Sequence, residues 1–158
     1  MLTILALILA TSFPSTSKTS WMRPESFHLA IGMTRSEAVR KLEEDGWKTQ
    51  KGDRPDQLIV DYTTTQSLTL DFHKDRLHSI RFELFTIIDQ IGNAFEEEKT
   101  YLETTFGEPK AIASKSMLIY DSTLPNIMVV VSNNSKSDSG KKGLGILLVR
   151  YYDPAEPK

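Results

Sequence analysis

The sequence contains no cysteine among its 158 residues, which excludes disulfide bonds, thiolate nucleophiles, cysteine-ligated metals and a cysteine-linked lipid anchor. It also has no excess of basic charge, because 19 Lys and Arg stand against 21 Asp and Glu. A nucleic-acid-binding protein normally presents a basic face, so we expect no nucleic-acid partner. No apolar run reaches the about 20 residues that a membrane-spanning helix needs, so no span is expected in the mature chain. The remaining composition, 39% hydrophobic and 25% charged residues, is typical of one globular domain.

The chain opens with an apolar run from Leu2 to Ala10, and small polar residues follow it. This length suits the core of a signal peptide, and the small residues next to Ala10 allow cleavage before Phe13, with an alternative site near Ser17. No Lys or Arg precedes the run, and a buried N-terminal strand or helix is the alternative interpretation. We predict a signal peptide over residues 1–17 and a periplasmic or secreted protein.

The segment after the apolar run is rich in Ser, Thr and Pro, and we predict a linker over residues 18–30. Trp21 and Met22 are large apolar residues inside this segment. We expect them to pack back onto the domain, and contact with a partner is the alternative. The folded domain is predicted over residues 31–152, with a C-terminal tail over 153–158.

Most of the predicted domain is organised by a stretch that occurs twice. Residues 58–72 align without a gap on residues 117–131, and both copies have an apolar run, a polar turn and a second apolar run. A third apolar run, 77–85, matches 144–152 at a larger shift, because the second copy has a longer turn. Such self-similarity predicts two copies of one supersecondary unit, and two unrelated hairpins with alternating patterns are the alternative. The predicted units are residues 31–85 and 93–152.

Local signals place a helix before the strands of each unit. Thr34 and Glu37 form a capping-box pattern that starts the first helix, and Gly46 is expected to end it in a left-handed conformation. Asn93 is predicted to start the second helix, and Gly107 to end it. Alternating apolar residues predict strands, with a hairpin turn at 73–76 and a bulge near His78. The predicted strands are residues 58–62, 67–72, 77–85, 117–121, 126–132 and 144–152.

These elements predict an α+β fold made of two tandem α-β-β-β repeats, with one antiparallel sheet and the helices on one face. The other face is expected to be polar in the first unit, at Thr69, Asp71, Arg81 and Glu83, and apolar in the second. Strands that are apolar on both sides are usually covered on both sides, so the Trp21 segment or a loop is one candidate cover. A protein partner is the other. The predicted partner-binding residues are Met128, Val130, Ile146, Leu148, Arg81, Glu83, Lys141 and Lys142.

Candidate chemistry is sparse. His73 and His78 flank the hairpin turn, but their spacing matches no compact metal motif. Asp71 and Glu83 share the outer sheet face near Arg81, where cross-strand charge pairing explains them without catalysis. Residues 139–143 depart from a phosphate-binding loop, which needs a glycine further upstream and a Ser or Thr after the lysine. We therefore predict no catalytic residue, no metal ligand and no cofactor.

Two stretches resemble the small exported proteins of the BamE-like and β-lactamase-inhibitor-protein-like group. The stretch Ile31–Val39 is similar to the group's Gly-Met-Thr opening before a helix, and Leu68–Ile80 is similar to its strand-turn-strand hairpin. The resemblance implies a non-enzymatic binding module that acts on an envelope protein or a secreted enzyme. BamE-like members are lipoproteins, and this chain lacks the lipid-bearing cysteine, so the anchor is not carried over. No motif matches the contact residues of the inhibitor, and none is transferred.

The sequence thus predicts an exported, non-enzymatic and monomeric module that binds another protein of the envelope or extracellular space. Binding would use the open sheet face or the loop over residues 133–143. One alternative is a small-molecule or lipid-binding module in which the apolar face of the second unit surrounds a ligand. A further alternative is a hydrolase that uses His73, His78 and Asp71, which requires these side chains to converge within about 3 Å of one another in a cleft.

Overall fold

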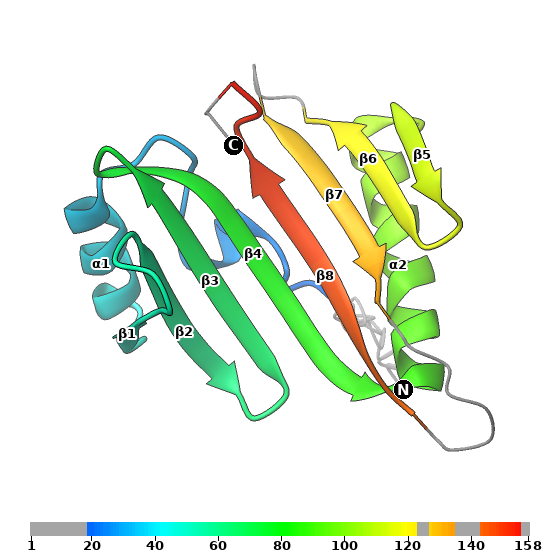
Figure 1. Cartoon of the computed structure of the whole chain (residues 1–158), viewed down its shortest axis with the longest axis horizontal. Helices are drawn as coiled ribbons and strands as arrows, with labels where there is room; N and C mark the ends of the chain where they lie inside the picture. The colour runs from blue at the N-terminus through cyan, green and yellow to red at the C-terminus, as the bar shows by residue number, and fades with distance from the viewer. Residues whose placement is uncertain (1–18, 123–126, 135–142, 156–158) are drawn as a thin grey trace, which may run out of the picture.

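The structure is a computed structural model of the whole chain, and it describes residues 19–122, 127–134 and 143–155. The predicted signal peptide, and Lys141 and Lys142 of the predicted binding surface, lie outside the described residues. The described chain forms one eight-stranded antiparallel sheet with two α-helices and a short 3-10 helix (Figure 1). The fold class is therefore α+β, as the sequence predicts.

The elements follow one order in each half of the chain: a helix and then four strands. The first half contains η1 (Pro24–Phe27), α1 (Arg35–Glu44), β1 (Thr49–Lys51), β2 (Gln57–Thr63), β3 (Gln66–His73) and β4 (Arg76–Ile87). The second half contains α2 (Ile88–Phe106), β5 (Ala111–Ser114), β6 (Met117–Asp121), β7 (Met128–Asn133) and β8 (Leu144–Tyr152). The sheet order is β1-β2-β3-β4-β8-β7-β6-β5, so the last strands of the two halves pair at its centre.

The sequence prediction of three strands after each helix is wrong, because β1 and β5 add a fourth. Both are short strands at the two edges of the sheet. Every side chain of β5 is exposed, and β1 carries the charged and polar residues Thr49–Lys51. An edge strand of this kind has no buried face, so it shows no alternation of apolar and polar residues that could reveal it.

The ungapped alignment of the two copies is also wrong in its first strand. Val60 of β2 is fully buried in the core, whereas Ile119, its match in the alignment, is only partly buried and is adjacent to buried residues. Because neighbouring side chains of a strand point to opposite faces, a one-residue offset separates the two strands. The buried side chains of β6 are Leu118 and Tyr120. In the next strands the alignment keeps the faces, since Leu70 and Val129 are both buried.

The predicted ends of the first helix are confirmed. The Thr34 backbone N–H donates to Glu37 Oε2 at 2.8 Å, and the Glu37 N–H donates to Thr34 Oγ1 at 3.2 Å, which completes the capping box. The hydrogen bond from the Thr34 backbone lowers the pKa of the Glu37 carboxyl. Gly46 follows the helix with a φ of 83°, in the left-handed region that glycine adopts without strain.

The predicted start of the second helix is wrong. Helix α2 begins at Ile88, directly after β4, and Asn93 lies one turn inside it. The Ile87 side chain makes no capping hydrogen bond, so no local motif marks this start in the sequence. The end is as predicted, because Gly107 caps the helix with a φ of 85°.

The β3–β4 hairpin has the predicted turn and bulge. Lys74 and Asp75 both have positive φ, 48° and 65°, as a two-residue turn between right-twisted strands requires. Across the ladder, Phe72 pairs with Leu77 while the preceding residue of β3 pairs with Ser79. His78 is therefore the extra residue of a bulge.

The core lies between the sheet and the helices, and the N-terminal segment belongs to it. Helix α2 and the η1 segment lie behind the strands in Figure 1. Trp21 and Met22 are buried, as predicted, and the Trp21 ring packs edge-on against Phe82 of β4 at 5.9 Å. Phe27 and Leu29 are buried too. The linker prediction is therefore wrong for this segment, because four of its side chains complete the core.

A buried ion pair ties the N-terminal segment to α2. Arg23 Nη2 lies 3.1 Å from Glu98 Oε2, and the Glu98 side chain is fully buried. The Arg23 guanidinium also stacks 3.5 Å from the centre of the Tyr101 ring and donates to the Thr19 carbonyl. Burial raises the pKa of Glu98 to about 7, although Arg23 opposes the shift. This carboxyl therefore changes its charge near neutral pH.

Candidate functional site

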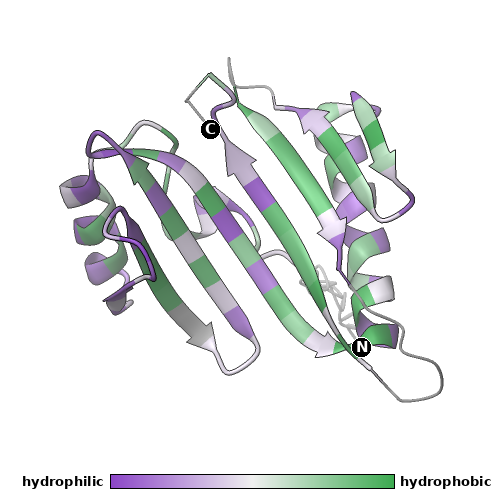
Figure 2. Ribbon diagram, in the orientation of Figure 1, coloured by the Kyte–Doolittle hydropathy of each residue, from purple (hydrophilic) through white to green (hydrophobic). Residues whose placement is uncertain are grey.

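The outer face of the sheet is the face that the described helices do not cover. Helix α2, α1 and the Trp21 segment all contribute to the core on the opposite side. The alternative that the Trp21 segment covers the apolar residues of the second unit is therefore wrong. The predicted residues Met128, Val130, Ile146 and Leu148 are half-buried on the outer face. Figure 2 shows that β7 is coloured largely as hydrophobic, whereas β3 and β4 carry hydrophilic bands.

A hollow of about 690 Å³ occupies this face over β4, β7 and β8. Of the predicted binding residues, Arg81, Val130 and Leu148 line it. Ile146 and Glu83 instead line a smaller hollow of about 250 Å³ further along the same face. We name the larger hollow the arginine groove, after the two arginine side chains in its lining. Its lining is His78, Arg81, Met117, Val130, Ser132, Asn134, Leu148, Arg150, Tyr152, Asp153 and Pro154.

The predicted C-terminal tail forms part of the groove wall. The Asp153 N–H donates to the carbonyl of His78, the bulge residue, at 3.0 Å. One carboxylate oxygen of Asp153 accepts from the Ala155 N–H at 2.8 Å, which closes a turn. The bulge and the tail are thereby held together, and Pro154 lies at the groove edge.

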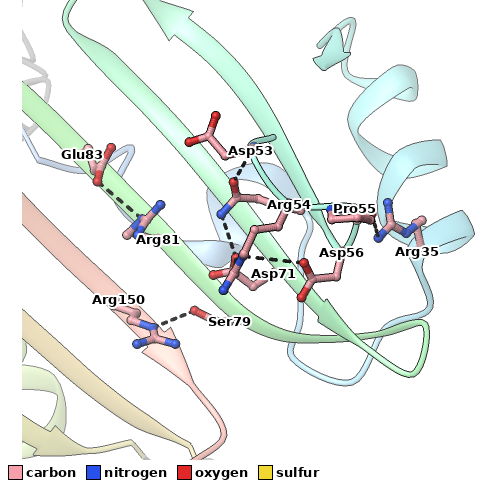
Figure 3. Close-up of polar contacts among 11 residues, drawn as sticks. Arg35, Asp53, Arg54, Pro55, Asp56, Asp71, Ser79, Arg81, Glu83 and Arg150 are labelled. Atoms are coloured by element: carbon pink, nitrogen blue, oxygen red, sulfur yellow. Dashed lines mark hydrogen bonds and ion pairs between the residues drawn. The ribbon is translucent and has the colours of Figure 1, made fainter. Parts of the chain in front are cut away.

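Two arginines from the central strands lie next to each other in the groove. Arg81 of β4 and Arg150 of β8 are register partners, an arrangement that places like charges opposite each other and is destabilising on its own. The Arg150 Nε donates to the hydroxyl of Ser79 at 2.8 Å, and its guanidinium lies 4.9 Å from the centre of the Tyr152 ring. Figure 3 shows the serine contact and the neighbouring Arg81–Glu83 pair.

The carboxylates of the outer face leave these arginines incompletely paired. Arg81 Nε lies 3.4 Å from Glu83 Oε1, but this buried Nε makes no hydrogen bond within the described chain. For Arg150, no described carboxylate comes within ion-pair distance. Asp71, the other acidic residue that we predicted on this face, is held by Arg54 (Figure 3) and accepts a hydrogen bond from Gln57 Nε2 at 2.9 Å.

The alternative hydrolase hypothesis required Asp71 to lie within hydrogen-bond distance of His73 and His78. The hydrogen bonds of Asp71 go to other residues. The rings of His73 and His78 are in edge-to-face contact, with their centroids 6.4 Å apart. Asp71 is buried and accepts hydrogen bonds from Arg54 and Gln57, which makes it a cross-strand structural contact. Within the parts of the chain that the structure describes, no group of three or more His, Asp or Glu side chains could hold a metal ion.

Sequence reasoning missed several residues of the groove, of which Arg150 is the most important. Its position was predictable, because Ile146, Leu148 and Arg150 alternate along one strand and therefore share a face. Its closeness to Arg81 was not predictable, because β4 and β8 are separated by more than fifty residues and their pairing is tertiary. Ser79 and Tyr152 gain their roles from the same pairing.

Comparisons of the chain with protein-family models, with curated proteins and with solved structures found no match. No helix of the described residues is long and apolar enough to cross a membrane. Any statement about function therefore depends on the geometry of the outer face.

Proposed function

We propose that the protein is a non-enzymatic binding module that docks on another protein through the outer face of its sheet. The observation that supports this proposal is the outer face itself: half-buried apolar side chains lie in and beside a hollow, with all described helices on the opposite side. A contiguous apolar region rimmed by polar residues is typical of an interaction surface. The proposal keeps Met128, Val130, Ile146, Leu148, Arg81 and Glu83 as partner-binding residues and adds Arg150.

The end of the β4–β8 pair that lies away from the groove, at and beyond the smaller hollow, carries exposed apolar residues of the same face. Phe85, Ile87 and Leu144 are 44%, 40% and 55% exposed. Phe85 pairs with Ile146, and Ile87 pairs with Leu144, across the two central strands. Burial of these side chains by a partner would stabilise a complex by about 25 cal/mol for each Å² of apolar surface removed from water.

Photo-crosslinking from the outer face tests the proposal. A benzoylphenylalanine residue at Leu148 is expected to give one discrete protein adduct in the cells that produce the chain. The matched control is the same residue at Ile112, which is 68% exposed on the edge strand β5. Leu148→Asp is expected to abolish partner binding and keep the fold, and Ile112→Asp is expected to leave binding unchanged. Equal adducts from both positions, or unfolding of Leu148→Asp with Ile112→Asp intact, would refute the outer face as the docking surface.

A second candidate function is the binding of a small molecule or lipid in the arginine groove. The volume of about 690 Å³ lies within the range of about 300–1,000 Å³ that ligand pockets occupy. The groove is lined by both apolar and polar side chains, as such sites are. Mass spectrometry of the protein under native conditions would reveal a retained ligand, and its absence from protein purified without detergent would favour the protein partner.

We further propose that the two halves of the chain derive from one duplicated unit and that the protein is exported and acts as a monomer. The support for duplication is the equivalent order of helix and four strands in each half and the mirrored order of strands about the centre of the sheet. Expression of residues 19–87 alone, which keeps the N-terminal segment of the core, should give a self-associating unit if the halves are duplicates. N-terminal sequencing of the mature chain tests export, with a start near Phe13 or Lys18 expected.

A further inference from the structure

We propose that the arginine groove recognises a carboxylate on an extended segment of a partner protein, with apolar side chains of the same segment packing along β8. This inference rests on the proposed function and specifies the chemistry of the partner. The recognised feature is an Asp or Glu side chain, followed at alternate positions by apolar residues. Arg81 and Arg150 would bind the carboxylate, and Leu148, Ile146 and Leu144 would contact the apolar residues.

The charge distribution of the groove calls for an anion. Its lining contains Arg81 and Arg150, and Asp153, the one acidic residue among the described residues of the lining, already accepts a hydrogen bond within its own turn. Glu83 compensates one arginine at 3.4 Å without a hydrogen bond. A carboxylate between the two guanidinium groups would relieve their repulsion and supply the missing hydrogen-bond acceptor. Arginine suits this contact because its planar group binds carboxylates through two parallel hydrogen bonds.

The two guanidinium groups are held in place before any ligand arrives. Arg150 is fixed by its hydrogen bond to Ser79 and by its stacking contact with Tyr152. Ser79 is itself fully buried on β4 and lies opposite Tyr152 in the ladder. Arg81 is restrained by Glu83. Side chains that are already ordered lose little conformational entropy on binding, which favours affinity.

The shape of the surface favours an extended peptide over a compact ligand. From Arg150, the side chains of Leu148, Ile146 and Leu144 follow at every second position of β8 on the same face. Six residues of strand span about 20 Å, and Ile146 and Glu83 form a second hollow beyond the first. A segment in extended conformation repeats its side chains at the same spacing of about 7 Å. The apolar row and the arginine pair thus match one carboxylate and the apolar residues next to it along an extended chain.

The test uses blocked synthetic peptides and the purified protein labelled with ¹⁵N. The probes are acetyl-Glu-Thr-Leu-Thr-Leu-amide and its Gln counterpart, together with the reversed sequences, so that both chain directions are covered. Binding is followed by the NMR shifts of the arginine Nε–H groups and of the β8 amides. Sodium octanoate serves as the small carboxylate. The variants are Arg150→Gln and, as a matched control on α1, Arg40→Gln.

We expect the Glu peptide to shift the Nε–H signals of Arg81 and Arg150 and to bind about tenfold more tightly than the Gln peptide. Arg150→Gln should weaken binding about tenfold and Arg40→Gln should leave it unchanged. Raising the salt concentration should weaken binding of the Glu peptide more than binding of the Gln peptide. Arg81→Gln provides the same test if Arg150→Gln does not fold.

Three results would overturn the inference. Equal affinity for Glu and Gln peptides would show that charge plays no part, and docking through the outer face would still stand. No binding of any peptide would remove the carboxylate site, and the crosslinking experiment would then judge the docking surface on its own. Tighter binding of octanoate than of the Glu peptide would assign the groove to a small carboxylate.

Discussion

Protonation of Glu98 should control the stability of the fold near neutral pH. Its side chain is fully buried, with Arg23 at 3.1 Å as its ionic partner. Burial raises its pKa from the ordinary value of 4.5 to about 7, against the opposing effects of Arg23 and the Thr19 hydroxyl. The charge of Glu97 adds slightly to the shift. The folded state therefore holds a proton on Glu98 at pH values where the unfolded chain has released it.

The direction and size of the effect follow from linkage. Because the pKa of this acid is raised on folding, its contribution to stability is complete below about pH 4.5 and is lost as the pH rises through about 7. A shift from 4.5 to about 7 corresponds to about 3 kcal/mol at 1.36 kcal/mol per pH unit. For a chain of this size that is a fall in melting temperature of about 6–12 °C.

Thermal unfolding between pH 5 and pH 8 measures the effect, with Glu98→Gln as the comparison. Gln keeps an acceptor for Arg23 but cannot ionise, so the variant should lose this component of the pH dependence while other groups titrate as before. The difference in unfolding free energy between the two proteins should therefore change by about 2.5 kcal/mol across this range, since a small part of the effect is already lost at pH 5. Parallel profiles for wild type and Glu98→Gln would refute the argument, because they would mean that Glu98 titrates alike in both states.

Two further substitutions test the fold with matched controls. Gly46→Val should lower the free energy of unfolding by about 1 kcal/mol or more, because the φ of 83° at this position is strained for any side chain although the space around it is open. As the control, Gly92→Ala within α2 should raise the free energy of unfolding by about 1 kcal/mol. An unchanged melting temperature for Gly46→Val would contradict the assigned cap. Phe27→Ala should cost about 3–5 kcal/mol, since this ring is 1% exposed and packs on Phe82 at 5.8 Å. Phe85→Ala, at a position 44% exposed, should cost far less, and equal losses in chemical denaturation would show that the N-terminal segment is not part of the core.

Much of the fold could be predicted because the signals are local. The capping box at Thr34, the glycine at position 46 and the turn at Lys74 and Asp75 each depend on hydrogen bonds or backbone angles within a few residues. The bulge at His78 was predictable because Leu77 and Ile80 are out of phase along one strand. The strand cores follow from alternation between a buried and a half-exposed face.

The errors arise where local signals compete with tertiary contacts or are absent. The segment containing Trp21 and Phe27 has the composition of a linker, yet it is ordered because its aromatic rings fill space next to Phe82. The start of α2 has no side-chain cap, since the helix continues directly from β4. The candidate site shows the same difference between local and tertiary signals. The apolar residues of β7 and β8 were predictable from alternation, but the hollow that they line was not.

The sequence by itself determined that the protein is an α+β domain with an antiparallel sheet, because hydrophobic periodicity and capping residues act over a few neighbours in the chain. It also determined which side chains of β4, β7 and β8 share the outer face of the sheet. Only the tertiary structure decided that β4 pairs with β8. That pairing brings Arg81 beside Arg150, places Ser79 under the guanidinium and brings the tail at Asp153 to the groove edge. No local pattern encodes such contacts, because they depend on which distant strands bury their apolar faces in one common core.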